Sequence, residues 1–496
     1  MLLNGLANHG KTFEAEVCVV GAGAAGLTLA MDLAARGVSV LLLESGGVKF
    51  QWESHELLDV ERMGDTPERL VTGTRERYFG GTTNHWGGLC RPFDAFEFEE
   101  KPWVPNSGWP ISRDDLQPYY EAAARLLNLP EVDRPYDLAA LGVAGHPTLL
   151  GEFVDNLEPR VAHRAPTGRL RMGQWRLEDI KKNPLITCLL NTTVAEIHSA
   201  RSGDHIEYLE GRTLQKGSLQ FRARDYVLCT GAIENARLLL ASNAVHPAGL
   251  GNEHDLVGRF YMDHAANGLG RILPLDPAAR PSAEEVLATR IPVGWANTPH
   301  ARREYKLQGF YALCINDNLK QPLAHERAIL SLTGAPQGGH SNSPSRLRKA
   351  LLVNWEQAPN PRSRILLSSS RDVLGVPKPA MDWNVTEQDI NSAAKSAELL
   401  SLAVAQGGRA RLQIGDLRKP PYTVGGGHQM GGTRMSVDPK EGVTDMNGRV
   451  HALENLFVGG SSLFPTGGWQ HPTLTIVALA LRQAEFLGAR HARIGS

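Results

Sequence analysis

Glu16-Val-Cys-Val-Val-Gly21-Ala-Gly23-Ala-Ala-Gly26 is the stretch that decides the fold of this chain. An apolar strand pattern runs directly into Gly-x-Gly-x-x-Gly, and helical spacing continues to about Arg36. Gly37 suits the end of that helix, and Val38–Leu43 predicts a second strand. The three segments predict a βαβ unit of the Rossmann type.

The glycines of this turn have separate physical roles. Gly21 permits the tight turn, Gly23 lets the backbone approach a pyrophosphate, and Gly26 lets the helix pack closely on the strand. Ala24 and Ala25 open the helix, whose N-terminal N–H groups favour negative charge. The turn therefore predicts a dinucleotide site.

An acidic residue closes the second strand. Glu44 stands eighteen residues after Gly26, where it is expected to accept a hydrogen bond from a ribose 2′-hydroxyl, and Ser45 follows it. A carboxylate there would repel a 2′-phosphate, so NADP is disfavoured. The motif alone does not separate FAD from NAD.

Composition limits the class of function. The chain has 496 residues, 42% hydrophobic and 21% charged residues, and a net charge of −1. This length predicts at least two domains, and the charge balance argues against nucleic-acid or anionic-membrane partners. Five dispersed cysteines without a CxxC pair argue against disulfides and metal sites. Small-molecule chemistry is expected.

The sequence shows no targeting or spanning segment. The first ten residues have neither a basic nor an apolar region of the kind found in signal peptides. The longest apolar helical segment, Leu474–Leu481, is too short to cross a bilayer. A cytoplasmic enzyme is the expectation.

The middle of the chain changes character. Short strands are expected from Ile186 to Leu228, followed by a helix over Ala232–Ser242. Between Gly268 and Gly408 alternating strands such as Gln308–Ile315 and Arg364–Ser369 precede a helix over Thr386–Gln406. This block predicts a second domain with an antiparallel sheet.

Two further loops are rich in glycine and in chemically active side chains. Arg77–Gly88 reads Arg-Tyr-Phe-Gly-Gly-Thr-Thr-Asn-His-Trp-Gly-Gly, whose paired glycines would let backbone press against a flat ring. His428-Gln-Met-Gly-Gly-Thr-Arg-Met435 and Leu456–Thr475 place His428 and His471 in similar surroundings. Histidine suits proton abstraction because its ordinary pKa lies near working pH.

Together these motifs resemble the glucose–methanol–choline (GMC) family of FAD-dependent oxidoreductases, with pyranose-oxidase-like features. The resemblance rests on six ordered motifs: Gly21–Gly26, Gly80–Trp86, Gly231–Leu240, Glu356–Arg364, His428–Met435 and Asn455–Thr475. It implies an α/β fold, with a Rossmann-like FAD-binding domain and a substrate domain whose antiparallel sheet is flanked by helices. We predict a discontinuous FAD domain over 1–90, 180–262 and 421–496, and a substrate domain over 91–179 and 263–420.

The resemblance also assigns roles to residues. His428 matches the family's active-site base and His471 its partner; which of the two is the base stays open. Pro472 is well placed at a helix start, and that helix end would stabilise negative charge at the flavin. The residues expected to contact FAD are Gly21, Gly23, Ala24, Ala25, Gly26, Glu44, Ser45, Gly80, Gly81, Thr82, Asn84, His85, Trp86, Gly87, Val194, Gly231, Gly460, Ser461, Pro472 and Thr473.

His85 raises the question of a covalent cofactor. In pyranose-oxidase-like members of the family, a histidine at the matching place bonds to the flavin methyl carbon. The neighbouring Asn84 departs from that pattern. A covalent bond through His85 and a non-covalent FAD both remain open, with the non-covalent form favoured.

The expected function is oxidation of an alcohol, with a sugar or glycoside hydroxyl favoured by the resemblance. One histidine would take the hydroxyl proton while a hydride leaves the same carbon for flavin N5. Electrons would pass to oxygen, a quinone or a protein acceptor. Alternatives are a redox-silent flavin lyase of the hydroxynitrile-lyase type and the catalytic subunit of a multi-subunit sugar dehydrogenase. The sequence sets no oligomeric state.

Overall fold

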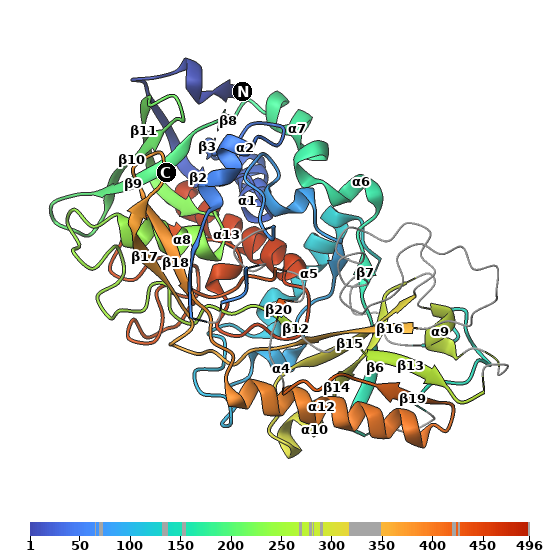
Figure 1. Cartoon of the computed structure of the whole chain (residues 1–496). Helices are drawn as coiled ribbons and strands as arrows, with labels where there is room; N and C mark the ends of the chain where they lie inside the picture. Colours follow the sequence, from blue (N-terminus) through green and yellow to red (C-terminus); the bar gives the residue numbers. More distant parts are fainter. Residues whose placement is uncertain are drawn as a thin grey trace.

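The computed structural model contains two large sheets, one in each half of the molecule (Figure 1). It describes residues 1–64, 66–68, 73–130, 137–150, 155–266, 270–276, 280, 282–287, 291–316, 349–418, 423–424 and 427–494. The mixed α/β class and the two-sheet architecture that the motifs predicted are confirmed.

The first sheet forms around the strand that precedes the glycine turn. Its neighbours are paired in parallel except at one edge, where a meander adds two antiparallel strands. In spatial order the strands are β1 (Leu2–Asn4), β8 (Ile186–Leu190), β3 (Val40–Leu43), β2 (Thr12–Val20), β11 (Ser218–Leu228), β10 (Ile206–Arg212) and β9 (Thr193–Ser199), with β21 (Leu456–Val458) also paired to β11. Segments from both ends of the chain therefore share one sheet.

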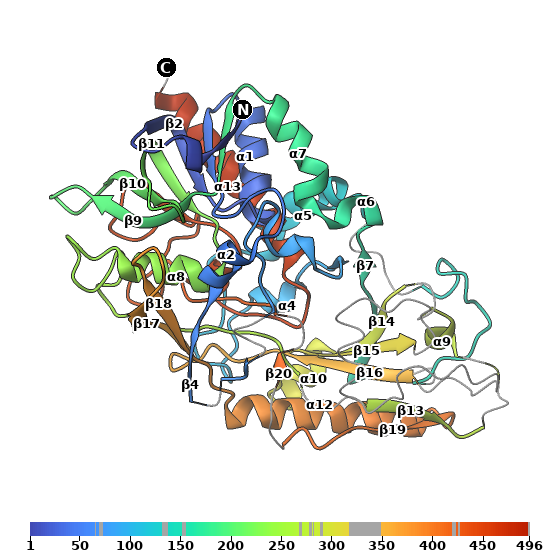
Figure 2. The same cartoon turned by 45° about the horizontal axis from the view of Figure 1, so that its top comes forward.

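Helices α1 (Ala24–Ala35) and α13 (Thr473–Ile494) lie side by side against this sheet (Figures 1 and 2). Two-thirds of the residues of α1 are buried because the helix is covered by both the sheet and α13. Helix α5 (Arg113–Leu127) packs on α13 in turn. In the described part of the chain, no helix combines the length and apolarity needed to cross a bilayer.

The second sheet is antiparallel throughout. Its strands are β19 (Ala410–Gln413), β13 (Gly270–Pro274), β16 (Lys349–Trp355), β15 (Phe310–Asn316), β14 (Val293–Asn297) and β6 (Leu157–Val161), with β12 (Ala265–Ala266) and β20 (Thr423–Val424) attached. Helix α12 (Glu387–Gln406) runs along its outer face (Figure 2). A capping box between Thr386 and Asp389 fixes the start of α12.

The remaining elements are shorter and connect these layers. A third sheet joins β17 (Arg364–Arg371), β18 (Pro377–Asp382) and β4 (Glu61–Met63). This pairing brings together segments from both predicted domains. The other elements are η1 (Gly5–Ala7), α2 (Trp52–His55), η2 (Glu56–Leu58), η3 (Gly81–Asn84), β5 (Leu89–Cys90), α4 (Ala95–Phe98), β7 (His163–Arg164), α6 (Thr167–Leu170), α7 (Met172–Lys182), α8 (Ala232–Ala241), α9 (Ala283–Leu287), α10 (Pro299–Glu304) and η4 (Ser461–Leu463).

Candidate active site

A large cavity of about 970 Å³ lies where loops from the first sheet meet strands of the second. Its wall begins at the turn between β2 and α1 and ends at the loops that carry the two candidate histidines. Among the lining residues are Gly21, Gly23, Ala24, Ala25, Glu44, Ser45, Gly81, Thr82, His85, Trp86, Gly87, Val194, Gly231, His428, Gly460, Ser461, His471, Pro472 and Thr473. Most residues predicted to contact a cofactor thus face one continuous space.

The glycine turn has the shape of a phosphate cradle. A Cβ at Gly23 would meet no atom of the described residues within 4 Å, and Gly23 lines the cavity. No side chain caps the first turn of α1, so its N–H groups face this end of the cavity uncapped. Both features fit the pyrophosphate of a dinucleotide, which needs close backbone approach and N–H donors.

Gly26 has a different role, because it faces protein. A Cβ there would lie 1.8 Å from the carbonyl oxygen of Gly21. Gly26 is outside the cavity lining and keeps α1 close to its strand. Gly80 and Asn84 are also outside the lining: Gly80 has a φ of +103°, and Asn84 donates to the Phe79 carbonyl at 3.0 Å. These two shape the loop that presents its neighbours.

Glu44 is buried beside the cradle. Its two oxygens accept from the backbone N–H groups of Ala22, at 3.0 Å, and Gly46, at 2.9 Å. Burial raises the pKa of Glu44, although these hydrogen bonds and the charge of Arg77 oppose the shift. Glu44 therefore braces the loops on both sides of the predicted ribose position as well as lining it.

His85 lies on the cavity wall with part of its ring exposed. Its Nδ1 is 3.0 Å from Oε1 of Glu76. This contact orients the ring and directs the other nitrogen, Nε2, away from the carboxylate.

His428 and His471 come together although they belong to different loops. Their ring centroids are 5.1 Å apart, with the planes at 79°. Backbone hydrogen bonds in both directions between Met262 and Met430 hold the first loop, and the second ends where α13 begins. The two histidines form one polar end of the cavity.

The start of α13 reaches the same end. Pro472 and Thr473 line the cavity immediately after His471. Because the first N–H groups of a helix lack partners within the helix, this terminus can stabilise negative charge next to the histidines.

A third histidine, which the sequence did not single out, supports His428 from behind. His264 is 1% exposed, and its Nδ1 lies 2.7 Å from Nδ1 of His428. Its Nε2 donates to the carbonyl oxygens of Gly468, at 2.8 Å, and Gly467, at 3.4 Å. Burial lowers the pKa of His264 to about 4, against the effect of the two carbonyls. His264 is therefore neutral at ordinary pH.

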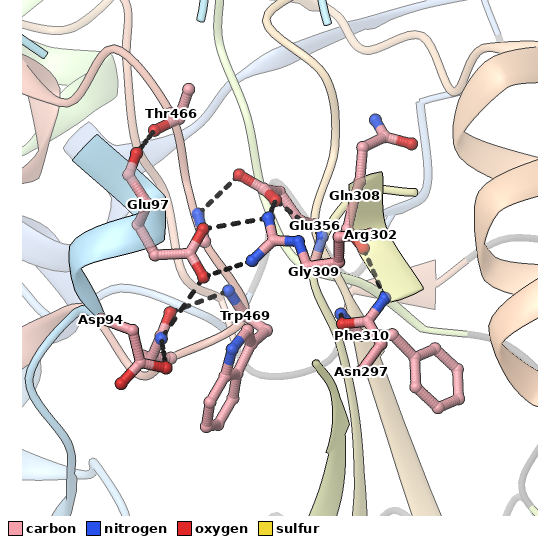
Figure 3. Close-up of polar contacts among 12 residues, drawn as sticks. Asp94, Glu97, Asn297, Arg302, Gln308, Gly309, Phe310, Glu356, Thr466 and Trp469 are labelled. Carbon is pink, nitrogen blue, oxygen red and sulfur yellow. Dashed lines mark hydrogen bonds and ion pairs between the residues drawn. The ribbon is translucent and has the colours of Figure 1, made fainter. Parts of the chain in front are cut away.

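The loop that carries His471 is braced by a buried ion cluster (Figure 3). Arg302 donates to both oxygens of Glu97, at 2.7 and 3.1 Å, and to Oε2 of Glu356, at 3.0 Å. The Oε1 of Glu356 accepts from the backbone N–H of Gly468 at 2.9 Å. Gln470 donates to Asp94 at 3.0 Å. The chain before His471 is thus held by the buried groups Glu97, Arg302 and Glu356 and by the partly exposed Asp94.

The two carboxylates of the cluster have pKa values shifted in opposite directions. Burial pushes the pKa of Glu97 upward, but the Arg302 guanidinium outweighs it and the pKa of Glu97 is lowered. Burial and the neighbouring charge of Glu97 raise the pKa of Glu356. Arg302 is the cation that both carboxylates share, so it holds the cluster together.

The second sheet supplies the wall opposite the glycine turn. Leu313 from β15 and Leu352 and Asn354 from β16 line the cavity, together with Leu89. The Oδ1 of Asn354 is buried and has no hydrogen-bond partner among the residues that the structure describes. A largely apolar wall with one such acceptor suits a molecule that carries hydroxyl groups.

Two family models match parts of this chain. The family model described as GMC oxidoreductase matches residues 359–480, and the model described as FAD dependent oxidoreductase matches residues 16–55. The two matches cover the loop of His428 and His471 and the glycine turn with Glu44.

Relatives match along nearly the whole chain. The fructose dehydrogenase large subunit of Gluconobacter japonicus is 25% identical, over 96% of this chain and 98% of its own length. The 6'''-hydroxyparomomycin C oxidase of Streptomyces lividus is 27% identical, over 96% of this chain and 91% of its own. The solved structure of pyridoxine 4-oxidase from Mesorbium loti has the same fold, with a TM-score of 0.60, 18% identity, and coverage of 95% of this chain and 99% of that one.

Proposed function

We propose that this chain, which belongs to the GMC family of FAD-dependent oxidoreductases, oxidises a hydroxyl group of a sugar or glycoside. The observation that carries the proposal is the pair His428 and His471 at one end of a cavity whose other end is a dinucleotide cradle. The sugar class is supported by the relatives named fructose dehydrogenase large subunit and 6'''-hydroxyparomomycin C oxidase.

Different residues of the cavity bind different parts of FAD and the substrate. Gly23 and the start of α1 hold the pyrophosphate, and Glu44 borders the ribose. The loop Gly81–Gly87 packs against the ring system, and Leu313, Leu352 and Asn354 hold the substrate. When bound, FAD supplies the two-electron acceptor for the hydride that leaves the carbinol carbon.

The histidines handle the proton. One takes the proton of the substrate hydroxyl, and the other donates a hydrogen bond to the oxygen on which charge develops. The start of α13, at Pro472 and Thr473, lies beside them and stabilises negative charge in this part of the cavity.

Anaerobic reduction of the bound flavin tests the proposal directly. Mixing the holoenzyme with a panel of sugars, glycosides and simple alcohols is expected to bleach the flavin absorbance with sugars. A His428→Gln variant should bind FAD but reduce on the order of 10²–10⁴-fold more slowly, the usual contribution of a general base. A flavin that no alcohol reduces would overturn the assignment and favour the redox-silent lyase.

The second candidate is a catalytic subunit of a multi-subunit dehydrogenase. It is favoured by the near full-length match to a protein named a large subunit. Purification of the chain from its native source separates the two: a stoichiometric partner supports the subunit, and a chain that turns over sugars alone supports a single-chain enzyme.

We propose His85 as a residue against the flavin ring, with non-covalent FAD favoured over a bond through His85. The contact between His85 and Glu76 supports an oriented ring. Acid precipitation distinguishes the two forms: non-covalent FAD leaves all yellow colour in the supernatant, whereas a covalent bond keeps it in the pellet.

We also propose that electrons leave to oxygen, a quinone or a protein, and that the enzyme works in the cytoplasm. A relative named oxidase supports oxygen as the acceptor, and a relative named dehydrogenase supports a quinone or a protein. Turnover with oxygen and with a soluble quinone, measured side by side, selects the acceptor, and cell fractionation tests the location.

A further inference from the structure

We propose that His264 fixes neutral His428 with its proton on Nδ1, so that Nε2 of His428 carries the lone pair and His428 is the base. His264 is a positioning residue in this proposal, because it acts through His428. The inference rests on the proposed function and settles which histidine takes the proton.

The hydrogen bonds of His264 with two backbone carbonyls determine which histidine donates in the hydrogen bond between His264 and His428. Carbonyl oxygens only accept, so Nε2 of His264 must carry the proton that it donates to Gly468 and Gly467. A neutral imidazole has one N–H, so Nδ1 of His264 holds a lone pair. Nδ1 of His428 lies 2.7 Å from Nδ1 of His264 and is therefore the donor in this hydrogen bond.

The reverse arrangement is disfavoured by burial. If His264 donated from Nδ1, its Nε2 lone pair would face two carbonyl oxygens in a site closed to water. If His264 carried both protons, a charge would stand in the core, which the lowered pKa of His264 opposes. Of these arrangements, only the first satisfies both ring nitrogens of His264 without placing a charge in the core.

The backbone holds the two rings in register. Met262 and Met430 form an antiparallel bridge, so His264, two residues after Met262, stands opposite His428, two residues before Met430. The backbone N–H of His428 also donates to Oδ1 of Asp263 at 2.9 Å. The consecutive residues Asp263 and His264 therefore hold His428, the first through its backbone N–H and the second through its ring.

This orientation prepares the proton transfer. The O–H bond of the substrate breaks as the N–H bond forms at Nε2 of His428, and the ring becomes a cation. Its Nδ1–H then donates to the lone pair of His264 as a charge-assisted hydrogen bond, which is stronger than the neutral one. His264 thus stabilises both the reactive tautomer and the product cation.

Nitrogen NMR of histidine-labelled holoenzyme tests the proposal without turnover. In the wild type, Nε2 of His428 should resonate as an unprotonated nitrogen and Nδ1 as a protonated one, assigned with His428→Gln. In His264→Leu the protons should redistribute towards Nε2, and flavin reduction by sugar should slow roughly tenfold to a hundredfold. His264→Asn, whose Oδ1 can accept from His428, should restore part of the rate and the tautomer.

His246→Leu is the matched control. His246 also contacts a backbone carbonyl, that of Gly203 at 2.9 Å, but lies outside the cavity lining. It should change neither spectrum nor rate. Protonated Nε2 on wild-type His428, or His264→Leu at the wild-type rate, overturns the proposal. Should His264→Leu not fold, the wild-type spectrum and His264→Asn decide. Failure of every sugar to reduce wild-type flavin would instead overturn the proposed function, whatever the tautomer.

Discussion

At the scale of single residues, two glycines of one motif are expected to respond differently to the same substitution. In Gly23→Ala the new methyl enters the cavity and meets no atom of the part of the chain that the structure describes. The fold should therefore persist while FAD binding weakens by about tenfold or more. In Gly26→Ala the methyl would overlap the Gly21 carbonyl at 1.8 Å, so the apoprotein should lose about 1–3 kcal/mol of stability or more.

Apoprotein unfolding and FAD titration of both variants measure the difference. Equal losses of apoprotein stability would contradict the separate roles of the two positions. Unchanged FAD affinity in Gly23→Ala would contradict the cradle.

Single residues also mark the limit of prediction from sequence. His428 and His471 could be found because each lies in a glycine-rich motif with a recognisable order. His264 could not, because it is 164 residues from His428 and its neighbours are ordinary core residues. Its meaning comes from the register of the Met262–Met430 bridge, which no local pattern encodes.

At the scale of elements, adjacent arginines of α10 provide a matched test of the buried cluster. Arg302 joins Glu97 and Glu356 with 2% of its side chain exposed, whereas Arg303 pairs with Glu99 with 54% exposed. Arg302→Met leaves two buried carboxylates without their shared cation and should cost about 3–5 kcal/mol. Arg303→Met should cost about 0–1 kcal/mol.

Denaturant unfolding of the two variants checks the contrast. Similar midpoints for both would show that the cluster does not hold the Gly468 loop. If Arg302→Met folds, slower flavin reduction is also expected, because the chain before His471 loses its brace.

The elements themselves were largely predictable. The strands and helices of the glycine turn, α8, α12 and the start of α13 follow from hydrophobic period and from capping residues. The pairing of β4 with β18 was not predictable, because it joins segments more than 300 residues apart and no local sequence pattern records it.

At the scale of the whole molecule, two buried groups predict acid sensitivity in two pH ranges that overlap only between about pH 4 and 4.5. The pKa of His264 is about 4 in the folded chain, below its ordinary value of 6.5, so the unfolded chain binds the extra proton and stability falls as pH drops from 6.5 towards 4. Fully developed, this loss is about 3 kcal/mol. Burial pushes the pKa of Glu234 upward, but Arg237, Arg77 and Arg75 outweigh it and hold it at about 2, so its contribution is lost between 4.5 and 2.

Unfolding of the wild type and of His264→Asn at pH 7, 5.5 and 4.5 measures the upper range. The variant should lose less stability than the wild type over this interval. Parallel curves would show that His264 is protonated equally in the folded and unfolded chains.

The position of strand β16 affects how the enzyme could evolve to accept new substrates. Asn354 of β16 lines the cavity, while Glu356, directly after the strand, accepts from the backbone N–H of Gly468, and the carbonyl of the same residue accepts from His264. Recognition and proton chemistry therefore share one stretch of backbone. Mutations that reshape the binding wall through β16 should show epistasis with His264 and His428, whereas mutations at Leu89 or Leu313 should combine with them additively.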